Sequence, residues 1–465
     1  MKRLASLLVA TAALSACTAG PDYQPALPSA TTQAALHASA EPAFTPDLPP
    51  PDWWRLYDDP RLDQFVTQAL EANTDLRVAA ANLAQARAVL RETRAGRSID
   101  TTINANGAYR RQSSAALGLP LDLPEGELYD AGLDVAYQLD LFGGIRRAVE
   151  ASRADVEAVQ AAYDLTRITV VAETVRAYTD ACSAGRRLVV AQRSVEVQEQ
   201  TFDLTRRLLE GGRGTALETN QAGALLEQTR AEIPTLEGLR QTALYRLAVL
   251  TGRPPAEFSR ELASCTSPLR LDSPIPVGDG AALLSRRPDV RAAERRLAAA
   301  TARIGVATAE LYPSISIGGS IGSTATAIGD LVSDSAFRYS IGPLISWSFP
   351  NMAVARSRIE QAEAGQQAAL AEFDGTWLQA LQETESALTV YARGLDRTRT
   401  LQRGTDQARE AARIARLRYE AGRESFQIVL DAERQLAVNE AALAQSEGQL
   451  STDLVSLFLS LGGGW

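Results

Sequence analysis

The sequence predicts an α+β membrane protein with an internal duplication. Two motifs of the first half recur in the second: Asp75–Ala80 returns as Asp289–Glu294, and Glu210–Arg213 returns as Glu420–Arg423. Proline-free stretches long enough for extended helices alternate with short segments in which every second residue is apolar. A repeated unit of this size usually means stacked or pseudo-symmetric geometry.

The N-terminus predicts export and lipidation. Lys2 and Arg3 precede an apolar run that is too short for a permanent membrane span, as in a signal peptide over residues 1–16. Small residues precede Cys17, as lipoprotein processing requires, and Thr18 stands where an aspartate would signal retention in the inner membrane. We expect acyl chains such as palmitate on Cys17, and an outer-membrane tether over residues 17–61. An ordinary signal peptide with an incidental cysteine is the alternative.

Composition argues against catalysis and against nucleic acid. The 465 residues carry 47 basic and 56 acidic side chains, a net charge of −9, which disfavours a nucleic-acid partner. His37, the one histidine, lies in a segment rich in Pro, Ala, Ser and Thr that reads as a solvated linker. We find no Gly-rich phosphate loop, metal-ligand spacing or activated nucleophile, so we expect no enzyme activity, cofactor or metal.

Long helices should fill the proline-free stretches. Between about Gly143 and Glu210, apolar residues follow the three-and-four spacing of a helix-packing seam: Ile168, Val171, Val175, Tyr178, Cys182 and Val189. At about 1.5 Å per residue such a helix is roughly 100 Å long, so it must lie against partner helices. We expect the chain to reverse near Gly212 and Gly422, and Pro234 to bend the first return helix.

Four segments have the period of a strand, near residues 99–111, 129–142, 313–322 and 336–349. Within the second, the odd-numbered residues from Tyr129 to Leu141 are apolar, whereas most even-numbered ones are polar. We expect two up-and-down strand pairs, one in a first structural repeat over residues 62–280 and one in a second over residues 281–465.

The aromatic residues suggest that these strands cross a membrane. A soluble sandwich would also explain the alternation, but aromatic side chains gather at the strand ends, as in an interfacial girdle. The candidate lipid-facing girdle consists of Tyr109, Tyr129, Tyr137, Phe142, Phe337, Tyr339, Trp347 and Phe349. Four strands cannot close a barrel, and an open edge would leave backbone groups unpaired in lipid, so the chain must oligomerise.

Several short motifs together resemble a known family. They are Cys17, Asp52-Trp53-Trp54 before Asp59-Pro60-Arg61-Leu62, Leu139–Gly144 with Arg146-Arg147, Arg286–Asp289 with Ala293-Glu294, Tyr312-Pro313-Ser314, and Leu461–Trp465. In this order and spacing the chain resembles the TolC family of outer-membrane factors, of the lipidated, NodT-like type that serves tripartite RND-type efflux pumps. Without the family, Pro288 with Asp289 reads as a helix start, and the Trp53-Trp54 pair as a contact that pins the tether.

The resemblance implies a homotrimer in which four strands per chain close one outer-membrane barrel. A long periplasmic helical barrel with a mixed equatorial region would continue it, and small molecules would pass through it passively from periplasm to exterior. The implied partners are a periplasmic adaptor protein, an inner-membrane pump and outer-membrane lipid.

The resemblance also implies a closed aperture near the turns at Gly212 and Gly422. By position, Glu218 and Asp431 resemble the constricting carboxylates, and Arg418, Tyr419 and Glu424 lie where polar latching contacts occur. Ile428 stands where some relatives place another acid. A two-ring acidic gate and a mixed polar and apolar constriction are both open.

After lipidation of Cys17, Cys182 and Cys265 remain in an oxidising compartment. Counting residues from the turn near Gly212 places both at compatible heights, so a disulfide is one reading. The other is that Cys182 only continues its apolar seam.

Two further functions compete with the channel. A periplasmic adaptor subunit would not need four girdled strands or a whole-length duplication. A structural envelope lipoprotein predicts no ion conductance in a planar bilayer, whereas a channel predicts conductance. The exported substrate, drug or metal, stays open.

Overall fold

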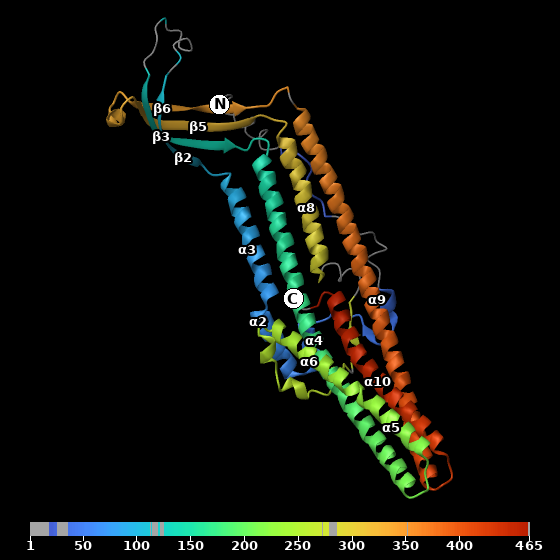
Figure 1. The fold of residues 1–465 in the computed structure, drawn as a ribbon. Coiled ribbons are helices and arrows are strands. Elements are labelled where there is room, and N and C mark those ends of the chain that lie inside the picture. Colours follow the sequence, from blue (N-terminus) through green and yellow to red (C-terminus); the bar gives the residue numbers. More distant parts are fainter. Residues whose placement is uncertain are drawn as a thin grey trace. The chain divides into compact units, whose positions relative to one another are not determined.

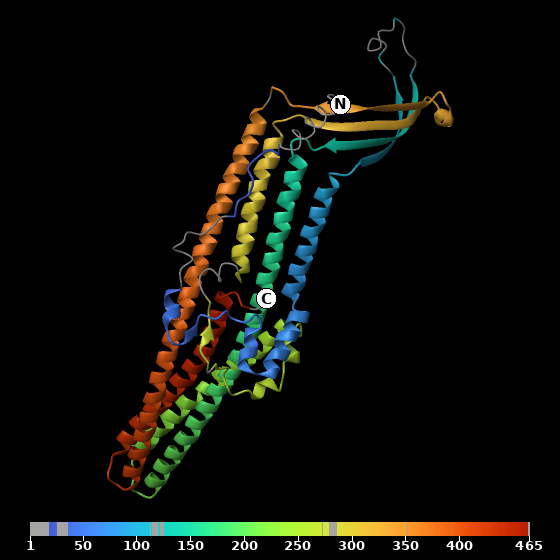
Figure 2. The same ribbon diagram turned by 180° about the vertical axis from the view of Figure 1, so that it is seen from behind.

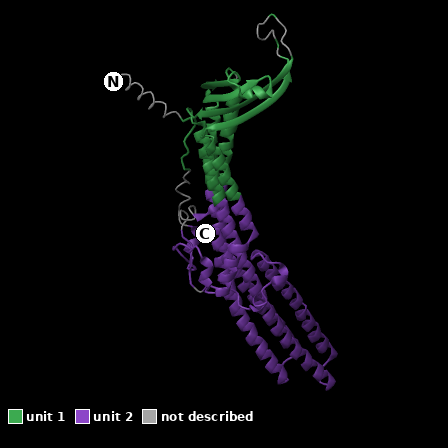
Figure 3. Ribbon diagram, turned by 90° about the vertical axis from the view of Figure 1, so that its left-hand side faces the viewer, with its two compact units in different colours: residues 1–26, 82–160, 292–374 green, residues 27–81, 161–291, 375–465 purple. Residues whose placement is uncertain are grey.

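The computed structural model describes residues 18–25, 36–111, 113, 120, 125–271, 273–278, 286–350 and 352–463. The predicted signal peptide over residues 1–16 and the predicted lipidation site Cys17 lie outside the described residues. The chain forms two compact units (Figure 3). Unit 1 consists of Met1–Ala26, Asn82–Gln160 and Ala292–Asp374, and unit 2 of Leu27–Ala81, Ala161–Arg291 and Gly375–Trp465.

Unit 1 holds a four-stranded antiparallel sheet in the order β2-β3-β5-β6 (Figures 1 and 2). Its strands are β2 (Asp100–Arg110), β3 (Gly126–Leu139), β5 (Ser314–Ala325) and β6 (Phe337–Ser346). The two predicted strand pairs are present, although β3 begins and ends three residues before the expected bounds. The structure adds the pairing of β3 with β5, which joins the two halves of the chain in one sheet.

The register sorts the side chains onto two faces. Ile103, Leu133, Ile321 and Tyr339 pair in turn across all four strands, so they lie on one face. Asp134, Ser320 and Ser340 form the neighbouring row on the opposite face. The predicted alternation is therefore kept in register from strand to strand, with one apolar and one polar surface.

Four long helices connect to the strands: α3 (Thr74–Ala95), α4 (Gly144–Glu210), α8 (Pro288–Ala309) and α9 (Ala353–Glu420). The start of α8 at Pro288 confirms the helix start read from the sequence. In unit 1, small residues bring α4 and α8 together, among them Ala154, Ala298 and Ala299. Ion pairs from Arg295 to Glu157 and from Arg303 to Asp155 flank this contact.

In unit 1, Arg147 binds the segment that follows Cys17. Arg147 is only 3% exposed and donates to the carbonyls of Ala19 and Gly20 and to Asp22. Gly305 leaves room for this contact, because a Cβ there would lie 2.8 Å from the Ala19 oxygen. Residues 18–25, the described start of the tether, are therefore bound to unit 1 through Arg147.

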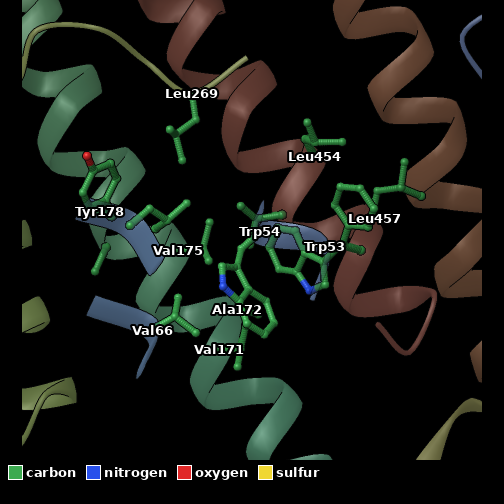
Figure 4. Packing of buried hydrophobic residues seen from close by; sticks show 14 of the residues in the cluster. Trp53, Trp54, Val66, Val171, Ala172, Val175, Tyr178, Leu269, Leu454 and Leu457 are labelled. Carbon is green, nitrogen blue, oxygen red and sulfur yellow. The ribbon is translucent and has the colours of Figure 1, made fainter. Parts of the chain in front are cut away.

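Unit 2 contains the main hydrophobic core (Figure 4). Trp53 is 1% exposed and stacks on Phe458 of α10 (Phe426–Ser460), with 4.6 Å between ring centroids. Trp54 donates its indole N–H to Asp63 of α2 (Pro60–Ala72). The tryptophan pair thus fixes this part of the tether to the helical body, as the sequence suggested.

A further part of the tether is bound through its backbone. Glu385 of α9 accepts hydrogen bonds from the backbone N–H groups of His37 and Ala38, at 2.6 and 3.0 Å. The two-residue strands β1 (Phe44–Thr45) and β4 (Ile275–Pro276) then pair in parallel. His37 accordingly lies in a docked segment, rather than in the solvated linker that composition suggested.

Unit 2 contains two helix pairs, in which α4 returns through α5 (Ala216–Arg230) and α6 (Glu232–Leu250), and α9 returns through α10. The first return path breaks at Ala231, three residues before Pro234. Both reversals have one geometry, because Gly212 and Gly422 have φ angles of 69° and 66°. The backbone N–H of Arg213 donates a hydrogen bond to the Leu208 carbonyl, and that of Arg423 donates one to the Arg418 carbonyl, each at 2.8 Å. The paired turns agree with the motif repeat seen in the sequence.

Candidate functional site

The first candidate site surrounds the two helix turns of unit 2, where the family resemblance implied a gate. Glu218 has a local role there. Its carboxylate accepts from the Thr215 backbone N–H at 2.9 Å, and its own N–H donates to the Thr215 hydroxyl at 3.2 Å. This capping box starts α5, so the position of Glu218 is explained by helix capping.

The structure does bring Arg418, Tyr419 and Glu424 together at the second turn. Arg418 lies 3.7 Å from Glu424 across the reversal. Tyr419 faces Phe426, with ring centroids 5.7 Å apart, beside a small buried cluster that includes Leu225 and Leu430. Burial raises the pKa of the Tyr419 hydroxyl, and the nearby charge of Glu218 adds to this. Tyr419 of α9 thus packs against an apolar cluster formed by α5 and α10.

Asp431 lies separately, on an exposed part of α10. It accepts from the Gln427 side chain at 3.2 Å and lies 3.6 Å from Arg434, both on its own helix. None of these contacts joins α10 to another helix. Among the candidate gate residues, Asp431 is therefore an exposed carboxylate whose partners lie on its own helix.

A buried cluster that sequence reasoning missed lies nearby. Glu433 of α10 is 3% exposed, accepts from Arg416 of α9 at 2.5 Å, and accepts from the Thr201 hydroxyl of α4 at 2.9 Å. Arg416 also donates to Thr201 at 3.1 Å. A sequence signal existed, because Glu433 follows Phe426 and Leu430 at the spacing of the apolar helix face.

Cys182 and Cys265 form a disulfide in unit 2. The bond joins α4 to the segment after η6 (Leu262–Ser264). Gly185 is needed beside it, because a Cβ there would lie 2.0 Å from the Cys265 carbonyl oxygen. The pairing therefore fixes an irregular segment to the long helix.

The second candidate site is the sheet of unit 1. Its apolar face is open, since Ile103 is 83% and Ile341 81% exposed in the single chain. Its polar face carries a hydrogen-bonded network that includes the pairs Asn104 with Asp134 and Ser320 with Ser340. Such a two-faced sheet can separate lipid from water.

Seven of the eight candidate girdle residues lie on the odd-numbered face of the strands or adjoin it, and Phe142 does not. Six of them share the odd-numbered face of the strands or continue it: Tyr109, Tyr129, Tyr137, Phe337, Tyr339 and Trp347. Trp347 stacks on Phe349, and its indole N–H donates to the Leu311 carbonyl. Phe142 instead stacks on Tyr312 with 4.5 Å between ring centroids, so it packs against its own chain beside the start of α4.

Neither site contains a metal-binding arrangement within the described ranges, where no group of His, Cys, Asp and Glu side chains is placed to hold a metal ion. The described helices also lack a segment long and apolar enough to cross a membrane.

This chain is similar to known proteins both in sequence and in structure. Residues 65–253 and 281–463 match the family described as Outer membrane efflux protein. Outer membrane protein OprJ of Pseudomonas aeruginosa is 32% identical over 99% of this chain and 95% of its own length. Nodulation protein T of Rhizobium leguminosarum bv. trifolii is 28% identical over 97% and 95%. The solved outer-membrane channel OprN is 38% identical, with a TM-score of 0.91 over 97% of this chain and 100% of OprN. With matched segments covering most of its length, the chain belongs to the Outer membrane efflux protein family.

Proposed function

We propose that this outer-membrane efflux protein works as a homotrimer, in which four strands from each chain close one barrel. The observation that carries the proposal is the open sheet: β2 and β6 are its edges, and its apolar face is exposed in the single chain. Unpaired backbone groups in lipid cost several kcal/mol each, so each edge needs a partner strand. Pairing β6 of one copy with β2 of the next gives each edge strand this partner.

In this barrel the apolar face contacts lipid and the polar face lines water. The girdle residues on the odd-numbered face then lie near the two membrane interfaces. Small molecules pass along the polar face by diffusion, without catalysis. The two matched ranges, one in each half of the chain, support the structural repeats over residues 62–280 and 281–465.

The resting gate, on this proposal, lies near the turns at Gly212 and Gly422. Three copies of Asp431 around one axis form an acidic ring that attracts cations and holds water. Arg418, Tyr419 and Glu424 support the turn next to it, and Glu218 acts as the cap of α5. Opening requires the α9–α10 pair to move away from α4 when a periplasmic adaptor protein docks, as part of an assembly with an inner-membrane pump.

Lipidation at Cys17 is a separate proposal about anchoring. Cys17→Ser should block acylation and the associated signal processing, whereas barrel assembly should persist because the strands hold the membrane independently. Mass spectrometry of the wild-type N-terminus tests the claim, and an unacylated mature N-terminus would refute it.

Planar bilayer recording of purified protein tests the function itself. Discrete conductance steps, together with a native mass of three chains, are the expected result. A structural envelope lipoprotein would give no conductance, and an adaptor subunit would not insert into the bilayer as a trimer.

A further inference from the structure

Arg338 of β6 forms an ion pair with Asp130 of β3, across the intervening strand β5. Its Nη2 donates to both carboxylate oxygens of Asp130 on β3, at 2.8 and 2.9 Å, although β5 lies between the two strands. Its Nε donates to the Thr324 hydroxyl on β5 at 3.0 Å, and that hydroxyl donates to Asp130 at 2.6 Å. Arg338, Asp130 and Thr324, which we call the exit collar, thus connect three strands on the polar face.

Two glycines make this reach sterically feasible. Arg338 pairs in register with Gly322, and Gly322 pairs with Gly132, so no side chain stands between the guanidinium and Asp130. A Cβ on Gly132 would lie 3.3 Å from Arg338 Nη2, closer than ordinary contact. The guanidinium therefore lies close to the backbone of β3 at Gly132, near the loop end of β6.

The collar balances charge on the polar face. The charged even-numbered residues of the described strands are Asp100, Arg110, Asp130, Asp134 and Arg338. Asp134 has the neutral amide of Asn104 as its partner, so its charge is not cancelled. Arg338 cancels Asp130, and without it two acids on one strand would face the same space.

We propose that Arg338 sets the ion selectivity of the barrel exit, an inference that rests on the proposed trimeric barrel. In a trimer the pair occurs three times at one level, as a neutral collar. The collar therefore adds no net charge at its level, and Asp134 is the uncancelled acid of β3 on the polar face. Loss of Arg338 would leave Asp130 as a second uncancelled acid on β3, which would favour cations over anions at the exit.

The test is the reversal potential of single channels in a KCl gradient, in wild type and in an Asp431→Ala background, which removes the proposed acidic ring. Arg338→Gln should raise the K⁺/Cl⁻ permeability ratio about twofold or more, because Asp130 loses its counter-charge. Arg338→Gln combined with Asp130→Asn removes both charges and should return the ratio to its starting value. Arg55→Gln, which breaks the ion pair with Asp63 in unit 2 and lies outside the sheet, should leave the ratio unchanged.

The outcomes separate the two proposals. If the wild-type protein does not conduct, the proposed function fails. If it conducts but Arg338→Gln leaves the ratio unchanged in both backgrounds, the collar does not face the path and the inference is overturned. Equal shifts in the single and double variants would mean that Arg338 acts only by holding the strands, which also overturns it.

Discussion

Glu433 on α10 lies 2.9 Å from the hydroxyl of Thr201 on α4, and this contact bridges the two helix pairs of unit 2. Arg416 neutralises the buried carboxylate from α9. In the proposed opening the α9–α10 pair moves away from α4, so Thr201 would separate from Glu433. The cluster therefore favours the closed arrangement.

Glu433→Ala should open the channel. The change leaves Arg416 beside Thr201 without its counter-charge. This should destabilise the closed arrangement by about 3 kcal/mol, the lower end of the cost of breaking a buried ion pair, because Arg416 is partly exposed. Single-channel conductance should rise. Glu440→Ala is the matched control, since Glu440 pairs with Arg409 inside the α9–α10 pair and joins no other helix. Equal conductance in both variants would contradict the role of Glu433.

Asp431→Ala combined with Tyr419→Phe should also raise conductance, and should weaken the preference for cations. The first change removes the acidic ring, and the second removes a hydroxyl while keeping the ring that faces Phe426. Antibiotic entry into cells carrying the variant gives a second readout. Glu196→Ala, on α4, should change neither quantity. Wild-type behaviour of the double variant would place the constriction at another level.

The gate shows where sequence reasoning was incomplete. Thr215 with Glu218 is a capping box that can be read from spacing alone, yet the family resemblance drew attention to the charge of Glu218. Glu433 was missed because its partners, Thr201 and Arg416, come from two other helices. Helix periodicity shows that an acid lies on the apolar face, but it does not show which side chains meet it.

The fold was more predictable, because a period of two or of about 3.6 residues follows from local backbone geometry. That is why the strands and the helix from Gly144 to Glu210 were found close to their observed bounds. The docking of the tether was not predictable. Glu385 binds the backbone N–H of His37, and Arg147 binds the backbone carbonyl of Ala19. Backbone groups leave no signature in the residue sequence.

The two faces of the sheet should respond oppositely to charge. Leu133→Arg places a cation on the apolar face and should cost about 2 to 4 kcal/mol if it lies near mid-bilayer, whereas Asp134→Arg should cost much less. Trimer yield in outer-membrane fractions is the measurement. Equal yields of the two variants would be incompatible with the assigned faces.

Asp180→Asn should stabilise the protein at neutral pH. Burial raises the pKa of the Asp180 carboxyl, and Arg176 and Thr452 only partly offset this. The folded protein therefore holds this proton more tightly than the unfolded chain, so stability falls as pH rises from about 4 through the raised pKa. The gain from asparagine should appear at pH 7 and vanish near pH 4. Thermal unfolding at both values measures it, and an equal gain at both would exclude titration as the cause.

Gly305→Ala should release the start of the tether from unit 1. The new methyl group would lie 2.7 Å from Arg147 Cγ and 2.8 Å from the Ala19 oxygen, and such overpacking costs about 1 to 3 kcal/mol. Hydrogen exchange at residues 18–25 should accelerate, because the hydrogen bond from the Ala19 N–H to the Phe142 carbonyl opens more often. Gly365→Ala is the control, since no atom outside its own helix backbone would lie within 4 Å of a Cβ there. Unchanged exchange at residues 18–25 in Gly305→Ala would show that Arg147 holds the segment without the space that Gly305 provides.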